Sequence, residues 1–332
     1  MQPIVIFANM LVHLVLSAQA LVATQGSAVS RNPKATSSRR VCRMQDTEAT
    51  RDPAPAVCSL GPVVEYMPGP PTAAVVPPGQ CAFTDEWSAV PLTKREAVSH
   101  DTLLLSFGLD ESRPLGLSTC ACLLARASID GSDVVRPYTP VSTNAMRGAF
   151  QLLVKVYPEG EMSSHLASLP LGATVDFKHI AANVKRQYPF GVRKVVMLAG
   201  GTGITPMLQA LHALLGTADD QTETTLLYSS KTEADILART ALDSWAASHA
   251  GRFRITHTLT QEPTTSAWSG QRGRIDGALI AQNAPPPGDG DVLFFVCGPP
   301  AMYDALAGPR GEPELSGALA ALGYTAEQVV KM

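Results

Sequence analysis

The chain has 332 residues, of which 45% are hydrophobic and 17% charged, and its formal net charge is −3. This length predicts about two domains of roughly 150 residues each, and the composition is typical of a folded protein. Because there is no basic excess, nucleic acid is not expected as a partner.

Residues 1–45 are predicted to be a targeting or anchoring segment. Positions 3–23 carry no charged side chain, and no acidic residue occurs before Asp46. As an uncleaved membrane anchor followed by Arg31, Lys34, Arg39, Arg40 and Arg43, the segment would leave the rest of the chain facing the cytosol, on the endoplasmic reticulum or the mitochondrial outer membrane. Alternatively, cleavage after residues 18–20, Ala-Gln-Ala, would leave a Ser- and Arg-rich transit peptide and an organelle interior as the destination.

Residues 46–81 form a Pro-rich linker between this segment and the predicted folded part. Such a composition predicts an extended tether with little packing. Folded structure is expected from about Ala82 onward.

The stretch 82–182 is predicted to be an antiparallel β-barrel. Short alternating runs separated by turns occur at 90–94, 102–108, 120–127, 134–141 and 150–157. The third run contains Cys120 and Cys122, whose thiols are expected on one face of a strand, in the core. No cysteines show the paired CxxC spacing of a zinc or iron–sulfur site.

The stretch 190–332 is predicted to be a Rossmann-like α/β domain with a parallel sheet. Strand-like runs at 194–199, 224–229, 252–258 and 291–296 alternate with helical stretches, which is typical of crossover connections between parallel strands. The fold class is therefore a two-domain β plus α/β protein.

The run 136–142 reads Arg-Pro-Tyr-Thr-Pro-Val-Ser and suits a flavin nucleotide. Arg136 can pair with a pyrophosphate, Tyr138 can lie on a fused-ring system, and Thr139 or Ser142 can hydrogen-bond a ring nitrogen. The alternative is an edge strand, which tolerates two prolines because it lacks a ladder partner on one side.

A glycine-rich turn at 200–203 separates a predicted strand from a predicted helix. Backbone N–H groups and the positive end of a helix dipole meet at such a turn, which suits a phosphate. Gly200, Gly201 and Gly203 permit close backbone approach. Thr205 is expected to cap the helix, with Pro206 at its first position.

Four ordered motifs carry a family resemblance: RPYTPVS at 136, GEMSSHL at 160, GGTGITPM at 200 and CGPP at 297. Over roughly 88–332 the chain resembles the NADH-cytochrome b5 reductases, within the ferredoxin-NADP reductase superfamily. The resemblance implies a flavoprotein with FAD and NADH as cofactors. Hydride would pass from NADH to FAD, and single electrons to a separate partner, cytochrome b5 or a similar haem protein.

The same resemblance implies roles for individual residues. Thr205 and Cys297 would be catalytic, beside the flavin and the nicotinamide. The implied cofactor-binding residues are Arg136, Pro137, Tyr138, Thr139, Ser142, Lys155, Tyr157, Gly160, Met162, Ser163, Gly200, Gly201, Thr202, Gly203, Thr205, Asp235, Cys297, Gly298, Pro299 and Met302, and no metal is expected.

Simpler structural roles compete with several of these. Lys155 could be a solvated strand residue, Ser163 a helix N-cap, Asp235 a carboxylate at a helix start and Cys297 a small buried hydrophobe.

In the family the residue matching Asp235 lies by the adenosine ribose, where its charge would repel a 2′-phosphate and favour NADH. Ser229 and Lys231 favour NADPH instead, since a hydroxyl and a cation can hold that 2′-phosphate. An NADPH-linked reductase serving a ferredoxin-like or other acceptor is therefore the alternative enzyme. A tethered, non-catalytic nucleotide-binding module is the alternative of another class.

The chain departs from the family pattern at two places. A Leu-Ser-Thr-Cys-Ala run at 117–121 stands where a Gly-Gln-His-like turn is usual, and the chain ends on Met332 instead of an aromatic residue.

Overall fold

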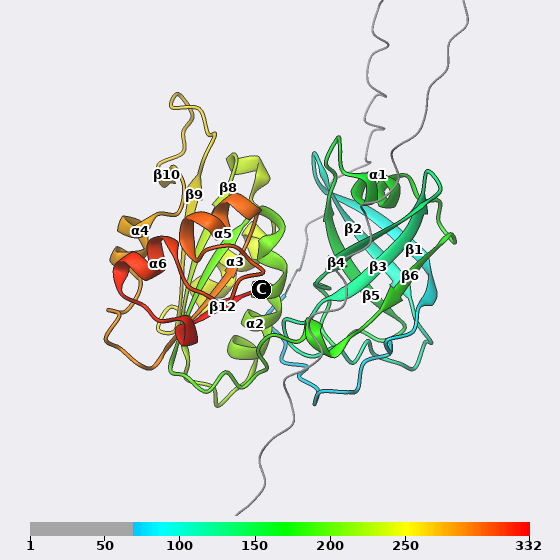
Figure 1. Ribbon diagram of the computed structural model, residues 1–332, viewed down its shortest axis with the longest axis horizontal. Helices are drawn as coiled ribbons and strands as arrows, with labels where there is room; N and C mark the ends of the chain where they lie inside the picture. The colour runs from blue at the N-terminus through cyan, green and yellow to red at the C-terminus, as the bar shows by residue number, and fades with distance from the viewer. Residues whose placement is uncertain (1–68) are drawn as a thin grey trace, which may run out of the picture. The chain divides into compact units, whose positions relative to one another are not determined.

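The computed structural model describes residues 69–332, so the predicted targeting segment and the linker up to residue 68 lie outside the described residues. Two six-stranded sheets follow one another along the described part (Figure 1). The first is antiparallel and the second parallel, which confirms the fold class expected from the sequence. Within 69–332, no helix has both the length and the apolar character that a bilayer crossing requires.

The antiparallel sheet has the strand order β4-β3-β6-β1-β2-β5. Its strands are β1 (Ser88–Ser99), β2 (Thr102–Gly108), β3 (Leu123–Ile129), β4 (Ser132–Tyr138), β5 (Ala149–Lys155) and β6 (Thr174–Lys178). Three fully buried rings form its centre, with Phe177 lying 4.9 Å from Phe107 and 5.1 Å from Phe150, both edge-to-face. A shift of register by one residue would move each ring out of this cluster, so burial of the three rings helps to fix the register.

Two details of this sheet differ from the sequence prediction. Strand β6 was not among the predicted runs, because five residues carry little periodic signal. The third strand begins at Leu123, since Cys120 has a φ of 62° and lies in a turn. Cys120 and Cys122 therefore do not share a strand face, and that prediction was wrong.

The parallel sheet has the strand order β10-β9-β8-β7-β11-β12. Its strands are β7 (Lys194–Gly200), β8 (Glu223–Ser230), β9 (Phe253–Leu259), β10 (Gln271–Arg272), β11 (Val292–Cys297) and β12 (Val329–Lys331). Five helices accompany them: α2 (Ile204–Gly216), α3 (Arg239–Ser248), α4 (Gly277–Asn283), α5 (Pro300–Leu306) and α6 (Gly317–Leu322).

Each face of the parallel sheet has its own core. Met197 of β7 packs in a cluster with residues of α2 and α3, whereas its neighbour Leu198 packs in a cluster with residues of α4, α5 and α6. The chain runs from β7 outward to β10, then returns to place β11 on the other side of β7. The carboxyl ends of β7 and β11 thus form the switch point at which open α/β sheets bind ligands.

Residues 69–81 contain no helix or strand, but they pack against the folded part. The Trp245 indole N–H donates to the Gly69 carbonyl at 2.9 Å, and the Thr72 N–H donates to Nδ1 of His212 at 2.9 Å. The prediction of a tether with little packing is therefore wrong for this stretch. Extended backbone has unpaired N–H and C=O groups, and side chains of the domains satisfy them here.

Candidate active site

One cavity of about 1000 Å³ lies where the ends of β4 and β5, helix α1 (Glu161–Ser168) and the turns after β7 and β11 meet. All of the cofactor-binding residues predicted from the sequence line it, except Ser142. The Ser142 hydroxyl accepts the N–H of Gln151 at 2.9 Å, and its carbonyl accepts the side-chain amide of Gln209 at 2.8 Å. Ser142 therefore secures the start of β5 and is not placed at the cavity.

Strand β4 supplies Arg136 and Tyr138 to this cavity. It is an edge strand, so the two prolines and the cavity role are compatible. The Arg136 side chain is 54% exposed, donates only to the neighbouring Val135 carbonyl, and lies 3.7 Å from Glu161. Because this exposed guanidinium is only loosely paired with Glu161, a bound anion could compete for it. Burial raises the pKa of Tyr138 to about 12, so its hydroxyl is neutral.

The start of helix α1 lines the cavity, where Gly160, Met162 and Ser163 are lining residues. Its N-cap is Gly160, with no side-chain cap, so the alternative that Ser163 is the N-cap is wrong. The Ser163 hydroxyl instead donates to the Gly160 carbonyl and accepts the Tyr157 N–H. The first N–H groups of a helix have no intrahelical partner, which leaves them available to a phosphate.

The two glycine turns of the nucleotide domain pack backbone against backbone. A Cβ on Gly203 would lie 2.1 Å from the Cys297 carbonyl oxygen, and one on Gly200 or Gly298 would lie 2.7 or 2.5 Å from Sδ of Met302. A side chain is thus excluded at Gly203, whereas at Gly200 and Gly298 it would displace the Met302 thioether, and the bare backbone of these turns forms one wall of the cavity.

Thr205 lines the cavity from inside the first turn of α2. A 3₁₀ turn at Gly201–Gly203 leads directly into the helix, whose N-cap is Gly203 without a side-chain hydrogen bond. The prediction that Thr205 caps this helix, with Pro206 at its first position, is therefore wrong. Thr205 is nevertheless buried beside the cavity.

Lys155 of the flavin domain contacts Asp235 of the nucleotide domain, and both residues line the cavity. Its Nζ lies 2.5 Å from Oδ2 of Asp101 and 3.0 Å from Oδ1 of Asp235, and its side chain is 11% exposed. It is therefore not a solvated strand lysine. The other oxygen of Asp235 accepts the N–H and hydroxyl of Thr232, so Asp235 also closes a capping box at a 3₁₀ turn, Glu233–Asp235.

These groups are charged at neutral pH. Burial alone would raise the pKa of Asp235, but hydrogen bonds from Thr232 and Lys155 outweigh it and leave that pKa below its ordinary value. Burial would lower the pKa of Lys155, but Asp101 and Asp235 together raise it above its ordinary value.

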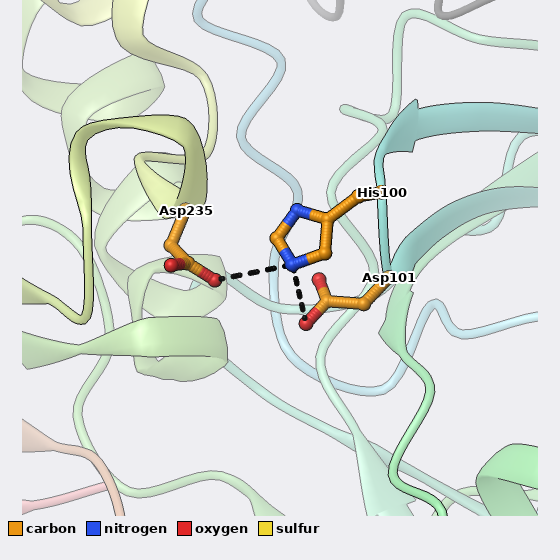
Figure 2. A group of neighbouring side chains, drawn as sticks. All are labelled: His100, Asp101 and Asp235. Carbon is orange, nitrogen blue, oxygen red and sulfur yellow. Dashed lines mark ion pairs between the residues drawn. The ribbon is translucent and has the colours of Figure 1, made fainter.

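Figure 2 shows His100 facing the same two carboxylates, with Nε2 at 3.5 Å from Asp101 and 3.9 Å from Asp235. This is the spacing of a metal site, but the Lys155 ammonium already pairs with both carboxylates and balances one of their two negative charges. Asp101 was not predicted, because only the β2–β5 register, in which Thr102 opposes Lys155, brings it to the Lys155 ammonium.

Cys297 ends β11 at the cavity, half-buried. Burial raises the pKa of its thiol, so it is a neutral wall residue and not a thiolate. Cys120 and Cys122 also line the cavity, and the Cys120 thiol contacts the Pro206 carbonyl at 3.2 Å. The C-terminal Met332 lines it too, buried.

We expect Cys297 to react slowly with iodoacetamide at pH 7.5, because alkylation requires the thiolate and a raised pKa keeps the thiol protonated. Peptide-resolved mass spectrometry should show slower labelling of Cys297 in the native protein than in the protein unfolded in urea, by about tenfold or more. Equal labelling rates in the two states would contradict a protonated, shielded thiol.

The residues at this cavity fit a dinucleotide flavin beside a second nucleotide. One end offers an exposed guanidinium, loosely paired with Glu161, and a helix N-terminus for phosphates. The other offers a backbone wall at the switch point of a parallel sheet. When bound, FAD would supply the chemistry of hydride acceptance, and these residues would orient it and exclude water.

Comparison with known proteins supports the same assignment. Residues 89–185 match an oxidoreductase FAD-binding domain and residues 197–307 an oxidoreductase NAD-binding domain. An NADH-cytochrome b5 reductase 2 of Aspergillus clavatus is 37% identical over 254 residues, covering 74% of this chain and 77% of its own. An NADH-cytochrome b5 reductase-like protein of Arabidopsis thaliana is 38% identical over 257 residues, with the same coverage.

This chain belongs to the NADH-cytochrome b5 reductase family. Among solved structures, the cytochrome b5 reductase domain of Ulva prolifera nitrate reductase superposes with a TM-score of 0.65 at 31% identity, covering 74% of this chain and 97% of that domain. As a member of this family, the protein is an FAD-dependent NAD(P)H oxidoreductase. That this cavity is its active site is the prediction that the residues lining it support. Which atom of each cofactor the individual residues contact stays a prediction.

Proposed function

We propose that this reductase oxidises NADH and delivers single electrons to cytochrome b5 or a similar haem protein. The observation that carries the choice of NADH is the buried carboxylate of Asp235 at the cavity mouth, charged at neutral pH. A fixed negative charge there disfavours the additional phosphate of NADPH. The proposed acceptor rests on the names of the relatives, which are NADH-cytochrome b5 reductases.

An NADPH-linked reductase remains the second candidate, because Ser229 and Lys231 line the same cavity and together could hold a 2′-phosphate. Anaerobic mixing of the purified, FAD-loaded full chain with NADH or NADPH separates the two. We expect fast bleaching of flavin absorbance by NADH, followed by haem reduction when cytochrome b5 is added. Faster bleaching by NADPH would favour the second candidate, and no bleaching by either would contradict both.

Replacing Asp235 should relax this coenzyme preference. In Asp235→Thr we expect the ratio of kcat/KM for NADH over NADPH to fall by about tenfold, the equivalent of one charge interaction of about 1.4 kcal/mol. The neighbouring Glu233 pairs with Arg239 and does not line the cavity, so Glu233→Gln is a control of equal charge change. An unchanged ratio in Asp235→Thr would remove Asp235 from coenzyme selection.

For location, we propose attachment to a membrane through the N-terminal segment, with the reductase facing the cytosol. The supporting observation is the uncharged run 3–23 followed by basic residues. Protein kept in the pellet after carbonate extraction, and cut by added protease on intact organelles, would agree. A mature N-terminus beyond residue 20 with protease protection would support an organelle interior instead.

A further inference from the structure

The stretch 69–81, which we call the strap, contacts both domains. It starts at Trp245 of α3, crosses α2 at His212, and reaches the flavin domain at Asn144. Immediately after the strap, the Ala82 N–H donates to the Leu115 carbonyl at 2.7 Å. A segment that precedes the first strand of one domain therefore begins on the other domain.

The nucleotide-domain end of the strap is closely fitted. Trp245 is 1% exposed, and its ring packs edge-to-face on His212 at 4.8 Å. Because Nδ1 of His212 accepts the Thr72 N–H, this imidazole nitrogen is unprotonated. A Cβ on Gly216, the last residue of α2, would lie 2.3 Å from the Ala73 backbone nitrogen, so only glycine leaves room for the strap.

The flavin-domain end of the strap is tied to two loops beside the active site. The Asn144 amide donates to the carbonyls of Ala74 and Leu117, each at 3.0 Å, and its oxygen accepts the Leu117 N–H. Asn144 follows the 136–142 motif, and Leu117 precedes Cys120, which lines the cavity. The strap, the loop that contains Leu117 and Cys120, and the loop after the flavin motif are therefore held together by the side-chain amide of Asn144.

We propose that the strap is a positioning element for the reductase: it holds the nucleotide domain against the loops that bear the flavin motif. This rests on the proposed function, because hydride transfer requires the two cofactors to be held within van der Waals contact. Direct contacts between the domains also exist, since the Gln209 amide donates to the carbonyls of Pro140 and Ser142. The strap adds a restraint that starts on α2 and α3 and ends on the same loop.

Gly216→Ala in the full, FAD-loaded chain tests this directly. The three atoms nearest the added methyl all belong to the strap, and the backbone of Gly216 is helical without positive φ, so the substitution displaces the strap with little effect on α2. Gly251→Ala is the matched control, because a Cβ there meets nothing within 4 Å. Should Gly216→Ala fold poorly, Trp245→Phe removes the indole donor to the strap together with part of a buried ring. Trp268→Phe, whose indole bonds Gln271, is its control.

Two readouts decide the outcome. Hydrogen–deuterium exchange should become faster by about tenfold in peptides covering 69–81, 115–121 and 139–148. The rate constant for flavin reduction at saturating NADH should fall by about tenfold, while both controls match the unmodified protein. Faster exchange confined to 69–81 with unchanged flavin reduction would overturn the proposal. Failure of the unmodified protein to bleach with any nicotinamide would instead overturn the proposed function, and the exchange data would still test the strap's hold on the loops.

Discussion

Replacing Arg136 with alanine should give a folded protein that is purified with little FAD. The Arg136 guanidinium is 54% exposed, and its ion pair with the exposed Glu161 carboxylate is 3.7 Å long, so its removal costs the fold no more than about 0.5 kcal/mol. A charge-assisted pair with a pyrophosphate is worth about 1.5–3 kcal/mol, which corresponds to a loss of roughly 10- to 100-fold in FAD affinity. Titration of apoprotein with FAD, followed by flavin fluorescence, measures this directly.

Arg147→Ala is the control for Arg136→Ala. Arg147 is also exposed, donates to the Ser112 carbonyl, and does not line the cavity. It should keep FAD content and thermal stability close to those of the unmodified protein. If Arg136→Ala retained full FAD content and affinity, the flavin end of the cavity would have to lie elsewhere.

Much of this fold is readable from the sequence because each layer repeats a simple pattern. Strands β2 and β7 are continuously buried apolar runs, and β5 alternates in part, so each carries a strand signal and falls within a few residues of its predicted position. The cavity was predictable because its residues lie in short motifs at turns. The glycine-rich turn at 200–203 suggests a phosphate site from its local sequence alone, without knowledge of distant contacts.

What the sequence did not reveal depends on contacts between distant segments or on local turn geometry. Asp101 reaches Lys155 only through strand register, and the strap packs through backbone groups that carry no side-chain signal. The prediction that Thr205 caps α2 failed because the sequence before a helix does not distinguish a 3₁₀ turn from a side-chain cap. Cys120 was assigned to a strand since a non-glycine residue with positive φ is uncommon.

Lys155→Met should destabilise the protein at neutral pH, because it leaves Asp101 and Asp235 facing each other without the ammonium, with only the exposed His100 imidazole near both. Breaking a buried pair by removing one partner costs about 3–5 kcal/mol, and we expect the lower end because Asp101 is 25% exposed. Urea unfolding at pH 7 measures this. Lys94→Met, which removes an exposed lysine paired with Glu96, should change stability by no more than about 0.5 kcal/mol.

The pH dependence identifies the cause of that loss. In the unmodified protein the pKa of Asp235 is lowered, so its stabilising contribution is present above the ordinary value of 3.8 and lost as pH falls through the folded pKa. The pKa of Lys155 is raised, so its contribution is present below 10.5 and lost as pH rises through the folded pKa. Between about pH 5 and 9 the ion pair therefore contributes evenly to stability.

In Lys155→Met, mutual repulsion and burial should raise the pKa of one carboxylate above its ordinary value, so the folded state gains protons and stability as pH falls. The destabilisation should then shrink between pH 7 and pH 5, and adding Asp101→Asn to Lys155→Met should restore part of the stability at pH 7. The loss of stability could instead stay constant with pH and not be relieved by Asp101→Asn. That result would mean that Lys155 stabilises the domain junction through the packing of its aliphatic stem and not through its charge.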